Sequence, residues 1–191
     1  MSGISQWSHG TGVRTVGAMR RDPAPNDFDG WVGQLARSHL RQQAKRHLRL
    51  AGPSSVPALR RGLRHPQAIV RRISAGILDQ LVDQESVPHL VAALDDADPA
   101  VCARALHALA CDACKQNDTR PDDELFVPRA LEFLRHHSNA DVRAAAVDAL
   151  VKVAHRRPDV ALALTAAAAG DSNPAIRNMA RIRIRRVRRE D

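Results

Sequence analysis

The sequence predicts an all-α chain that folds as a right-handed α-solenoid of about four helical hairpins. Three observations predict this class: one short pattern occurs four times, a second apolar pattern precedes its first three copies, and prolines with capping residues separate the two. A repeat unit of this length cannot bury its apolar face alone, so neighbouring copies must stack on one another.

The first pattern is a β-branched residue, usually followed by an Arg, with a small residue and then a branched aliphatic residue at four-residue spacing. Its copies begin 31, 41 and 34 residues apart. This spacing puts one stripe along a helix and predicts second helices at residues 70–83, 101–114, 142–155 and 176–189. The copies read Val70 Arg71 Ser74 Leu78, Val101 Cys102 Ala105 Leu109, Val142 Arg143 Ala146 Leu150 and Ile176 Arg177 Ala180 Ile184.

The second pattern is another apolar stripe of helical spacing, 14 or 15 residues before the first three copies. It reads Val56 Pro57 Leu59 Leu63, Val87 Pro88 Leu90 Leu94 and Val127 Pro128 Leu131 Leu134. Pro99 and Pro174 fit a first helical turn, and Asp98 and Asn173 are the expected N-caps. Each repeat is therefore expected to be two antiparallel helices, the fourth beginning with a helix at about Asp159–Ala169.

The expected organisation is a flexible tail at residues 1–29 followed by a solenoid at residues 30–191. The solenoid begins with a basic helix at 30–51 and continues with repeats at about 54–83, 86–114, 123–155 and 159–189. The longest interval between copies predicts an insertion of roughly seven to ten residues around Cys111–Asp123. The alternative is that the tail becomes ordered on a partner, and Trp7 would then be its only anchor.

At residues 53–191 the chain resembles the bacterial HEAT-like repeat proteins, which include lyase-associated subunits of phycobilisome assembly. The resemblance depends on Asp141-Val142-Arg143 with its following small residue, on Asp98-Pro99-Ala100-Val101, and on Asn173-Pro174-Ala175-Ile176-Arg177. It implies an armadillo-like superhelix used as a scaffold, in which Arg71, Arg143 and Arg177 brace the turns between repeats. Cys102 takes the place of this Arg in the second copy and is expected to be a buried small substitute.

Composition favours a single cytoplasmic domain with an aliphatic core. Apolar residues make up 44% of the chain and aromatic residues 3%, and Tyr is absent. The longest weakly polar run, Val160–Ala169, is too short to span a bilayer, and the first residues do not read as a secretion signal. Three cysteines without disulfide-like spacing suit a reducing compartment.

Charge is distributed unevenly along the chain. From Gly30 to Leu78 there are ten basic residues and no acidic one, whereas Asp79–Ile176 is acidic and Arg177–Asp191 is basic again. Basic stripes with one cation per turn run along the first and last predicted helices. One interpretation is a solvated capping face, and the other is a surface that binds anions. The candidate binding residues are Arg37, Arg41, Lys45, Arg49, Arg72, Arg181, Arg185 and Arg188.

His107, Cys111 and Cys114 form a second constellation, at helical offsets of four and seven. An imidazole and two thiolates at this spacing supply three zinc ligands, with a fourth needed from elsewhere. The matching positions in other copies are mostly polar, which predicts that the trio lies on an exposed face. A single CxxC is equally typical of surface or loop residues, and both interpretations stay open.

Sequence motifs of known catalytic chemistry are lacking. The chain has no His-Glu pair of the kind that holds iron in HEAT-like hydroxylases, no HExxH, no nucleophile elbow and no phosphate-binding glycine loop. We therefore expect a non-enzymatic scaffold without cofactors, whose basic surfaces bind an acidic protein and not a membrane. The alternative is a nucleic-acid-binding protein that uses the same Arg residues on phosphates.

Overall fold

The computed structural model describes residues 22–190 of the chain, with side chains described as far as Arg185. Its helices form a single stack of antiparallel pairs, joined by short turns that are partly 3₁₀-helical. In chain order the helices are α1 (Phe28–Gln34), α2 (Arg41–Leu50), α3 (Val56–Gly62), α4 (Ala68–Leu81), α5 (Val87–Ala92), α6 (Pro99–Ala110), α7 (Val127–His136), α8 (Ala140–Leu150), α9 (Pro158–Gly170) and α10 (Pro174–Glu190).

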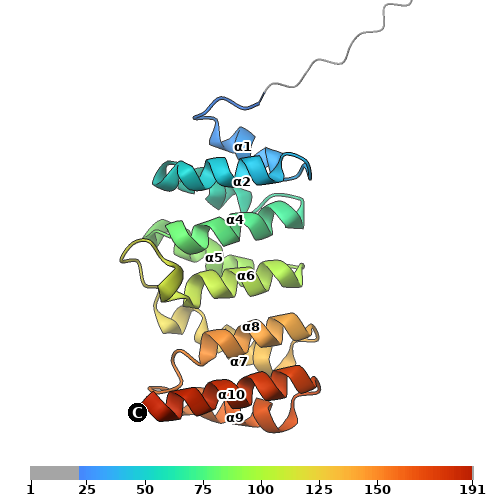
Figure 1. The fold of residues 1–191 in the computed structure, drawn as a ribbon, viewed down its shortest axis with the longest axis vertical. Helices are drawn as coiled ribbons and strands as arrows, with labels where there is room; N and C mark the ends of the chain where they lie inside the picture. Colours follow the sequence, from blue (N-terminus) through green and yellow to red (C-terminus); the bar gives the residue numbers. More distant parts are fainter. Residues whose placement is uncertain (1–21, 191) are drawn as a thin grey trace, which may run out of the picture.

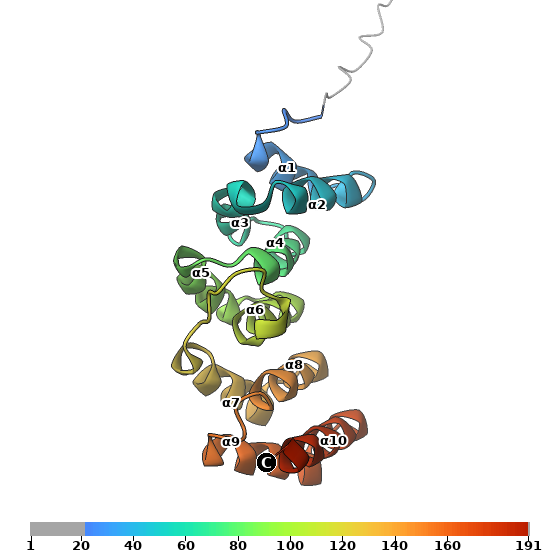
Figure 2. The ribbon, with the colours of Figure 1, turned by 60° about the vertical axis from the view of Figure 1, so that its left-hand side comes forward.

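The helices are arranged in two layers along one long axis. Helices α2, α4, α6, α8 and α10 stack in chain order as one layer, α3, α5, α7 and α9 form a second layer beside it, and α1 lies at the end of the stack next to α2 (Figures 1 and 2). Packing contacts join α2 to α4, α4 to α6, α6 to α8 and α8 to α10. The predicted all-α solenoid is confirmed, and the second helices do follow one another along a continuous surface.

The repeated stripes form the core. Val70, Leu78, Val101, Leu109, Val142, Leu150 and Ile176 are buried, and Ile184 is half-buried. Each fully buried Leu or Val contributes about 1.5–3 kcal/mol to folding. The predicted caps are also confirmed. The Asp98 carboxylate accepts from the Ala100 and Val101 amides at 2.9 and 3.3 Å, and Asn173 Oδ1 accepts from the Ala175 amide at 2.9 Å.

Close packing between α3 and α4 depends on the absence of a side chain at Gly62. A Cβ at this position would lie 2.4 Å from Ser74 Oγ and 3.0 Å from Val32 Cγ1, both too short for unstrained contact. Gly62 therefore allows α1, α3 and α4 to approach closely, and this fixes the start of the stack.

The predicted single helix at 30–51 is wrong, because the chain turns back at residues 35–40 and forms the separate helices α1 and α2. A helix of that length would extend about 33 Å, well beyond the roughly 21 Å of a neighbour such as α4. Folding back buries Leu35 against the stack, and Arg41 holds the turn by donating from Nε to Leu35 O at 2.8 Å. The described residues thus contain five helical pairs.

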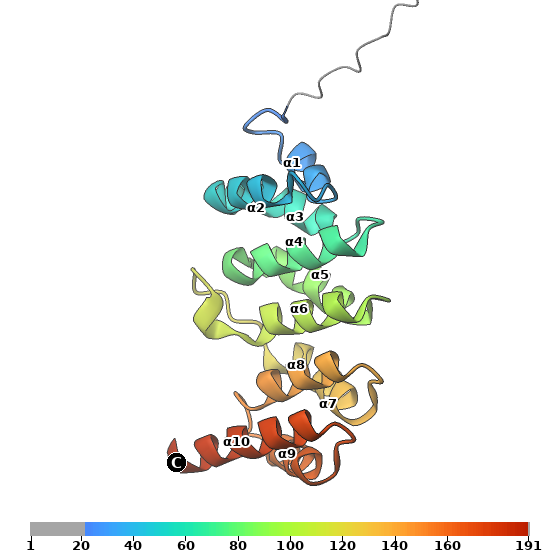
Figure 3. The ribbon, with the colours of Figure 1, turned by 45° about the vertical axis from the view of Figure 1, so that its right-hand side comes forward.

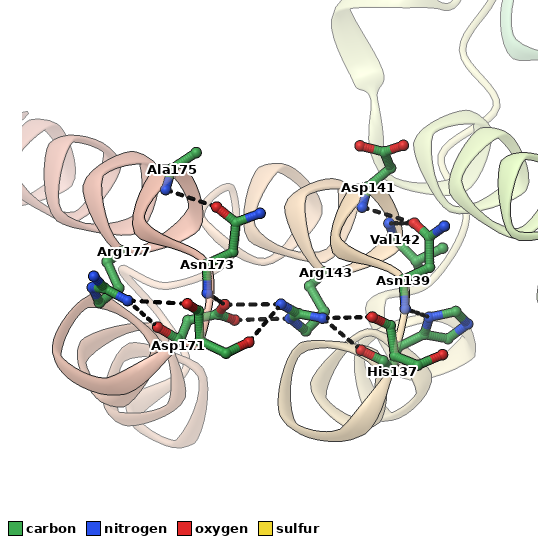
Figure 4. Close-up of polar contacts among 11 residues, drawn as sticks. His137, Asn139, Asp141, Val142, Arg143, Asp171, Asn173, Ala175 and Arg177 are labelled. Atoms are coloured by element: carbon green, nitrogen blue, oxygen red, sulfur yellow. Dashed lines mark hydrogen bonds and ion pairs between the residues drawn. The ribbon is translucent and has the colours of Figure 1, made fainter.

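An arginine from one repeat braces the turn of the next (Figure 4). Arg143 donates to both carboxylate oxygens of Asp171 at 2.9 and 3.0 Å, and also to Ser172 Oγ. Its remaining donors bond the carbonyls of His137 and Ser138 in its own turn at 2.8 and 3.0 Å. Arg143 and Asp171 are both largely buried, so one guanidinium closes two turns at once.

Arg71 forms the same brace two repeats earlier. The two braces confirm the structural role predicted for Arg71 and Arg143. Arg71 donates to Asp96 at 2.6 and 2.7 Å and to the His65 and Pro66 carbonyls. Arg177 makes only the contacts within its own turn, to the Asp171 and Ser172 carbonyls (Figure 4).

The second repeat lacks both halves of this brace. Cys102 replaces the Arg, is 2% exposed as predicted, and donates its thiol to Asp96 O at 3.0 Å. The turn that an arginine there would reach has His137 where the other turns have Asp96 and Asp171. His137 keeps the local function of those carboxylates, because its Nδ1 accepts from the Asn139 amide at 3.1 Å.

The predicted tail and the predicted insertion agree with the structure to different degrees. Most of the proposed tail, including Trp7, lies outside the described residues. Its last part is not a free linker: Trp31 Nε1 donates to Ala24 O at 3.0 Å, and Gln43 donates to Asp22 at 3.0 Å.

The expected insertion is a non-helical segment at residues 111–122 that runs beside the end of α4 (Figure 3). Within residues 22–190, no helix is both long and apolar enough to cross a bilayer.

Candidate partner-binding groove

A shallow groove of about 630 Å³ runs across the layer of second helices. Four successive helices line it, α2, α4, α6 and α8, so that no single repeat contains it. Its floor consists of small and aliphatic side chains such as Ile69, Ile73, Ala103 and Ala145, while charged side chains form its walls. No Trp or Phe of residues 22–190 lines this groove, and Trp31, Phe126 and Phe133 are buried in the core.

Four cations project into the groove without a charged partner. Lys45 and Arg49 come from α2, Arg72 from α4 and Arg104 from α6. Within the described part of the chain, none of the four forms an ion pair or a side-chain hydrogen bond. Because these charges are unneutralised and converge from three helices, they create a positive potential over one end of the groove.

The sequence patterns do not single out Arg104, although the repeat alignment contains the signal. Its counterparts in the other copies are Ile73, Ala145 and Met179, so a cation replaces an apolar or small residue at that position. The stem of Arg104 lies over Gly76 of α4, where a Cβ would meet Arg104 Cδ at 3.4 Å. The open surface of Gly76 therefore leaves room for the Arg104 side chain above α4.

The predicted basic residues separate into three groups. Arg41, Lys45, Arg49 and Arg72 do line the groove, although Arg41 also holds the turn before α2. Arg37 lies in that turn, outside the groove. Arg181 and Arg185 are exposed on α10 at the other end of the stack, where Arg181 donates to Ala168 O at 3.1 Å, and the Arg188 side chain is outside the described residues.

The groove becomes acidic toward α8. Asp141 and Asp148 line it there, and Asp148 also pairs with Arg183 of α10 at 2.9 Å. Lys152, in the turn after α8, also lines the groove and donates to Ala110 O at 3.1 Å. The groove is thus polar along its length, basic over α2, α4 and α6 and mixed over α8.

Many other basic residues are neutralised by carboxylates of neighbouring repeats. The Arg61 guanidinium pairs with Asp29 at 2.7 Å, and it lowers the pKa of that carboxyl by hydrogen bonding. The net basic charge of residues 30–78 is therefore concentrated in fewer free groups than the sequence indicates. The further pairs are Arg60 with Asp83 and Glu85, Arg71 with Asp96, Arg129 with Asp95 and Glu132, Arg156 with Asp123, and Arg157 with Glu124 and Asp159.

His107, Cys111 and Cys114 lie together at the edge of the groove. Their ligand atoms are all within 4.8 Å of one another. The expected exposure is wrong, since Cys111 is 7% exposed and both His107 and Cys114 are half-buried. Helix α6 also ends at Ala110, so a 3₁₀ turn at Asp112–Cys114, and not a longer helix, brings Cys114 back toward His107.

The two thiols differ in their acidity. The hydrogen bond between them and the partial burial of the site raise the pKa of Cys114 to about 11, with a further contribution from the charge of Asp79. Burial opposes ionisation of Cys111 too, but the hydrogen bond with Cys114 and the nearby Lys152 ammonium together hold its pKa below the usual value. Cys111 is therefore the more readily ionised thiol of the pair.

Stacked antiparallel helix pairs with a groove across the second helices define a repeat scaffold of the α-solenoid class. Residues 34–110 match the family model of HEAT repeats. This segment is thus similar to HEAT repeats, as the sequence predicts, and the described part as a whole has a HEAT-like solenoid fold.

Two solved structures share this fold. One is a chain from the complex of CpcE and CpcF of phycocyanin lyase from Nostoc sp. PCC7120, with 16% identity, a TM-score of 0.67, and coverage of 82% of this chain and 96% of that one. The other is an engineered protein from a structural genomics consortium, with 18% identity, a TM-score of 0.53 and coverage of 81% and 76%. Comparison with curated protein sequences gives no match.

Proposed function

We propose that this chain is a non-enzymatic binding module that holds an acidic segment of a partner protein in the groove. The observation that supports this best is the convergence of Lys45, Arg49, Arg72 and Arg104, unpaired among the described residues, from three helices over an apolar floor. Guanidinium groups suit carboxylates because their planar donors bond both oxygens. An acidic segment with interspersed aliphatic residues would complement both the walls and the floor.

A protein partner suits the groove better than a nucleic acid does. Asp141 and Asp148 lie in the same groove and would repel a phosphate backbone that continued along it. Stacking on aromatic side chains is a major source of affinity for single-stranded nucleic acid, and the described groove lining contains no aromatic residue. One of the structural neighbours is part of a two-protein complex, which is consistent with a protein-binding scaffold.

The test compares two double charge reversals with the same net change. Arg49→Glu with Arg72→Glu alters the groove, and Arg46→Glu with Arg135→Glu alters exposed residues outside it. The probes are a fluorescent 20-residue peptide rich in Glu and Leu and a single-stranded DNA of similar charge. Binding is measured by fluorescence anisotropy at two salt concentrations.

The proposal predicts that the groove variant binds the acidic peptide at least about tenfold more weakly than wild type, while the control variant changes much less, because rim charges far from the contact are screened. Equal weakening in both variants would mean that binding follows net charge alone and would overturn the groove assignment. Tighter binding of the DNA, with a slope of log K against log salt near about −3 for four phosphate contacts, would favour the nucleic-acid alternative.

A further inference from the structure

A buried carboxylate completes the cluster of His107, Cys111 and Cys114. Asp79 is in the last turns of α4, one repeat before the cysteines, and is 5% exposed. Its Oδ2 lies 3.4 Å from His107 Nε2, the same nitrogen that lies 3.4 Å from Cys114 Sγ. His107 Nε2 therefore lies beside both a carboxylate oxygen and a thiol of the cluster.

Asp79 is also incompletely satisfied without a ligand. Its Oδ1 is buried and has no hydrogen-bond partner among the described residues. A buried carboxylate oxygen left without a partner is costly, and native proteins rarely keep one. The corresponding positions in the next two repeats are Ala110 and Val151, so a carboxylate here takes the place of a residue that is apolar in those two repeats.

Three separations among the four groups are close to those of a tetrahedral zinc site. Ligand atoms at about 2.0–2.3 Å from a tetrahedral zinc ion lie about 3.3–3.8 Å from one another. The observed separations are 3.1 Å between the two sulfur atoms and 3.4 Å from His107 Nε2 to both Cys114 and Asp79. Two sulfur ligands select zinc over magnesium or calcium, which prefer oxygen ligands.

Cations around the cluster balance its negative charge. Two thiolates, one carboxylate and Zn²⁺ leave one net negative charge. Lys152 lies beside Cys111, and the fully buried Lys115 ammonium donates to Cys111 O at 2.9 Å. Zinc binding would displace the thiol protons of both Cys111 and Cys114 to solvent.

We propose that Asp79, His107, Cys111 and Cys114 bind one zinc ion, which joins the 111–122 segment and the end of α6 to α4. The segment already lies on α4, since the Gln116 amide donates to Gln80 O at 3.0 Å and Asn117 donates to Val82 O at 2.7 Å. No ligand position is left open for a substrate, so the role is structural. The ion would fix the insertion beside His107, at the edge of the groove.

The experiment uses untagged full-length protein purified without chelator. Metal content is measured by mass spectrometry, and Co²⁺ is added to the metal-free protein as a spectroscopic probe. We expect one zinc per chain, and with cobalt a thiolate charge-transfer band together with the visible bands of tetrahedral Co²⁺. Cys111→Ser with Cys114→Ser should abolish both, while the control Cys102→Ser, which removes a thiol elsewhere in the core, should bind like wild type.

Two further variants test the other ligands. His107→Gln changes a half-exposed side chain that the fold tolerates, and Asp79→Asn tests the buried carboxylate, with circular dichroism as the check on folding. Each folded variant should bind zinc more than about 100-fold more weakly, because it lacks a direct ligand and outer-shell changes alone cost about 10- to 100-fold. Absence of stoichiometric zinc with no cobalt spectrum, zinc binding that survives loss of both cysteines, or a Cys111–Cys114 disulfide in the isolated protein would each overturn the proposal.

Discussion

Replacing Arg143 by Ala should be among the most damaging single changes outside the apolar core. The substitution removes the bidentate pair with Asp171 and the bonds to the His137 and Ser138 carbonyls, and it leaves a 5% exposed carboxylate without its counter-charge. Breaking a buried ion pair from one side costs about 3–5 kcal/mol, because the remaining charge stays desolvated. A domain of this size has a total stability of about 5–15 kcal/mol, so the variant should be close to unfolding.

The effect should depend on pH in a defined direction. Hydrogen bonds from Arg143 are the main cause of a lowered pKa at Asp171, with burial acting against them. A lowered folded-state pKa stabilises the protein above the ordinary Asp pKa of about 3.9, and this contribution is lost as the pH falls through the folded-state value. The difference in free energy of unfolding between wild type and Arg143→Ala should therefore be largest at neutral pH and become smaller below about pH 4.

Urea unfolding followed by circular dichroism, repeated between pH 7 and pH 3, measures both quantities. Arg135→Ala is the matched control, since Arg135 is exposed and forms no ion pair within residues 22–190, and it should change the free energy of unfolding by no more than about 0.5 kcal/mol. If Arg143→Ala lowers the free energy of unfolding by less than about 1 kcal/mol at pH 7, or by an amount that does not change with pH, the role assigned to the Arg143–Asp171 pair is refuted.

Three further predictions concern the repeat scaffold and use the same unfolding assay. Gly62→Ala should destabilise the protein by about 1–3 kcal/mol through overpacking. The control Gly33→Ala, whose added Cβ meets nothing within 4 Å, should stabilise it by about 0.5–1 kcal/mol. Equal effects of the two substitutions would contradict the packing argument. Combining Cys102→Arg with His137→Asp should recreate the missing brace, with a favourable coupling of about 0.5–3 kcal/mol in a double-mutant cycle, and additive single effects would count against it. Asp98→Ala should cost about 1 kcal/mol by removing an N-cap, and Asn should substitute for Asp there with little loss.

The repeat alignment predicted the fold well because it depends on local periodicity. Stripes at four-residue spacing located α3 to α10, and the long interval located the insertion beside Cys111. The alignment could not show that the helix expected at 30–51 folds back, because its apolar spacing suits both one long helix and two short ones. The length of the neighbouring helices decides between them, and that length is a property of the stack.

The candidate sites were predictable only in part. Lys45, Arg49 and Arg72 were predicted as binding residues, but Arg61 and Arg71 carry the same charge and are neutralised by Asp29 and Asp96. His107 and the cysteines could be grouped by spacing. Asp79, 28 residues before His107, shows its relation to them only when α4 and α6 are packed side by side.

By itself, the sequence determined that this chain is built of paired helices, which faces of those helices are apolar, and where the N-caps and the insertion fall. These properties depend on residues within a few turns of one another, because periodicity reports the direction of a side chain around its own helix axis. Only the tertiary structure decided which cations remain unpaired in the groove and which carboxylate meets the thiols. Those relations join different repeats, and the distance between two charges across a stack depends on how the helices pack and not on their separation along the chain.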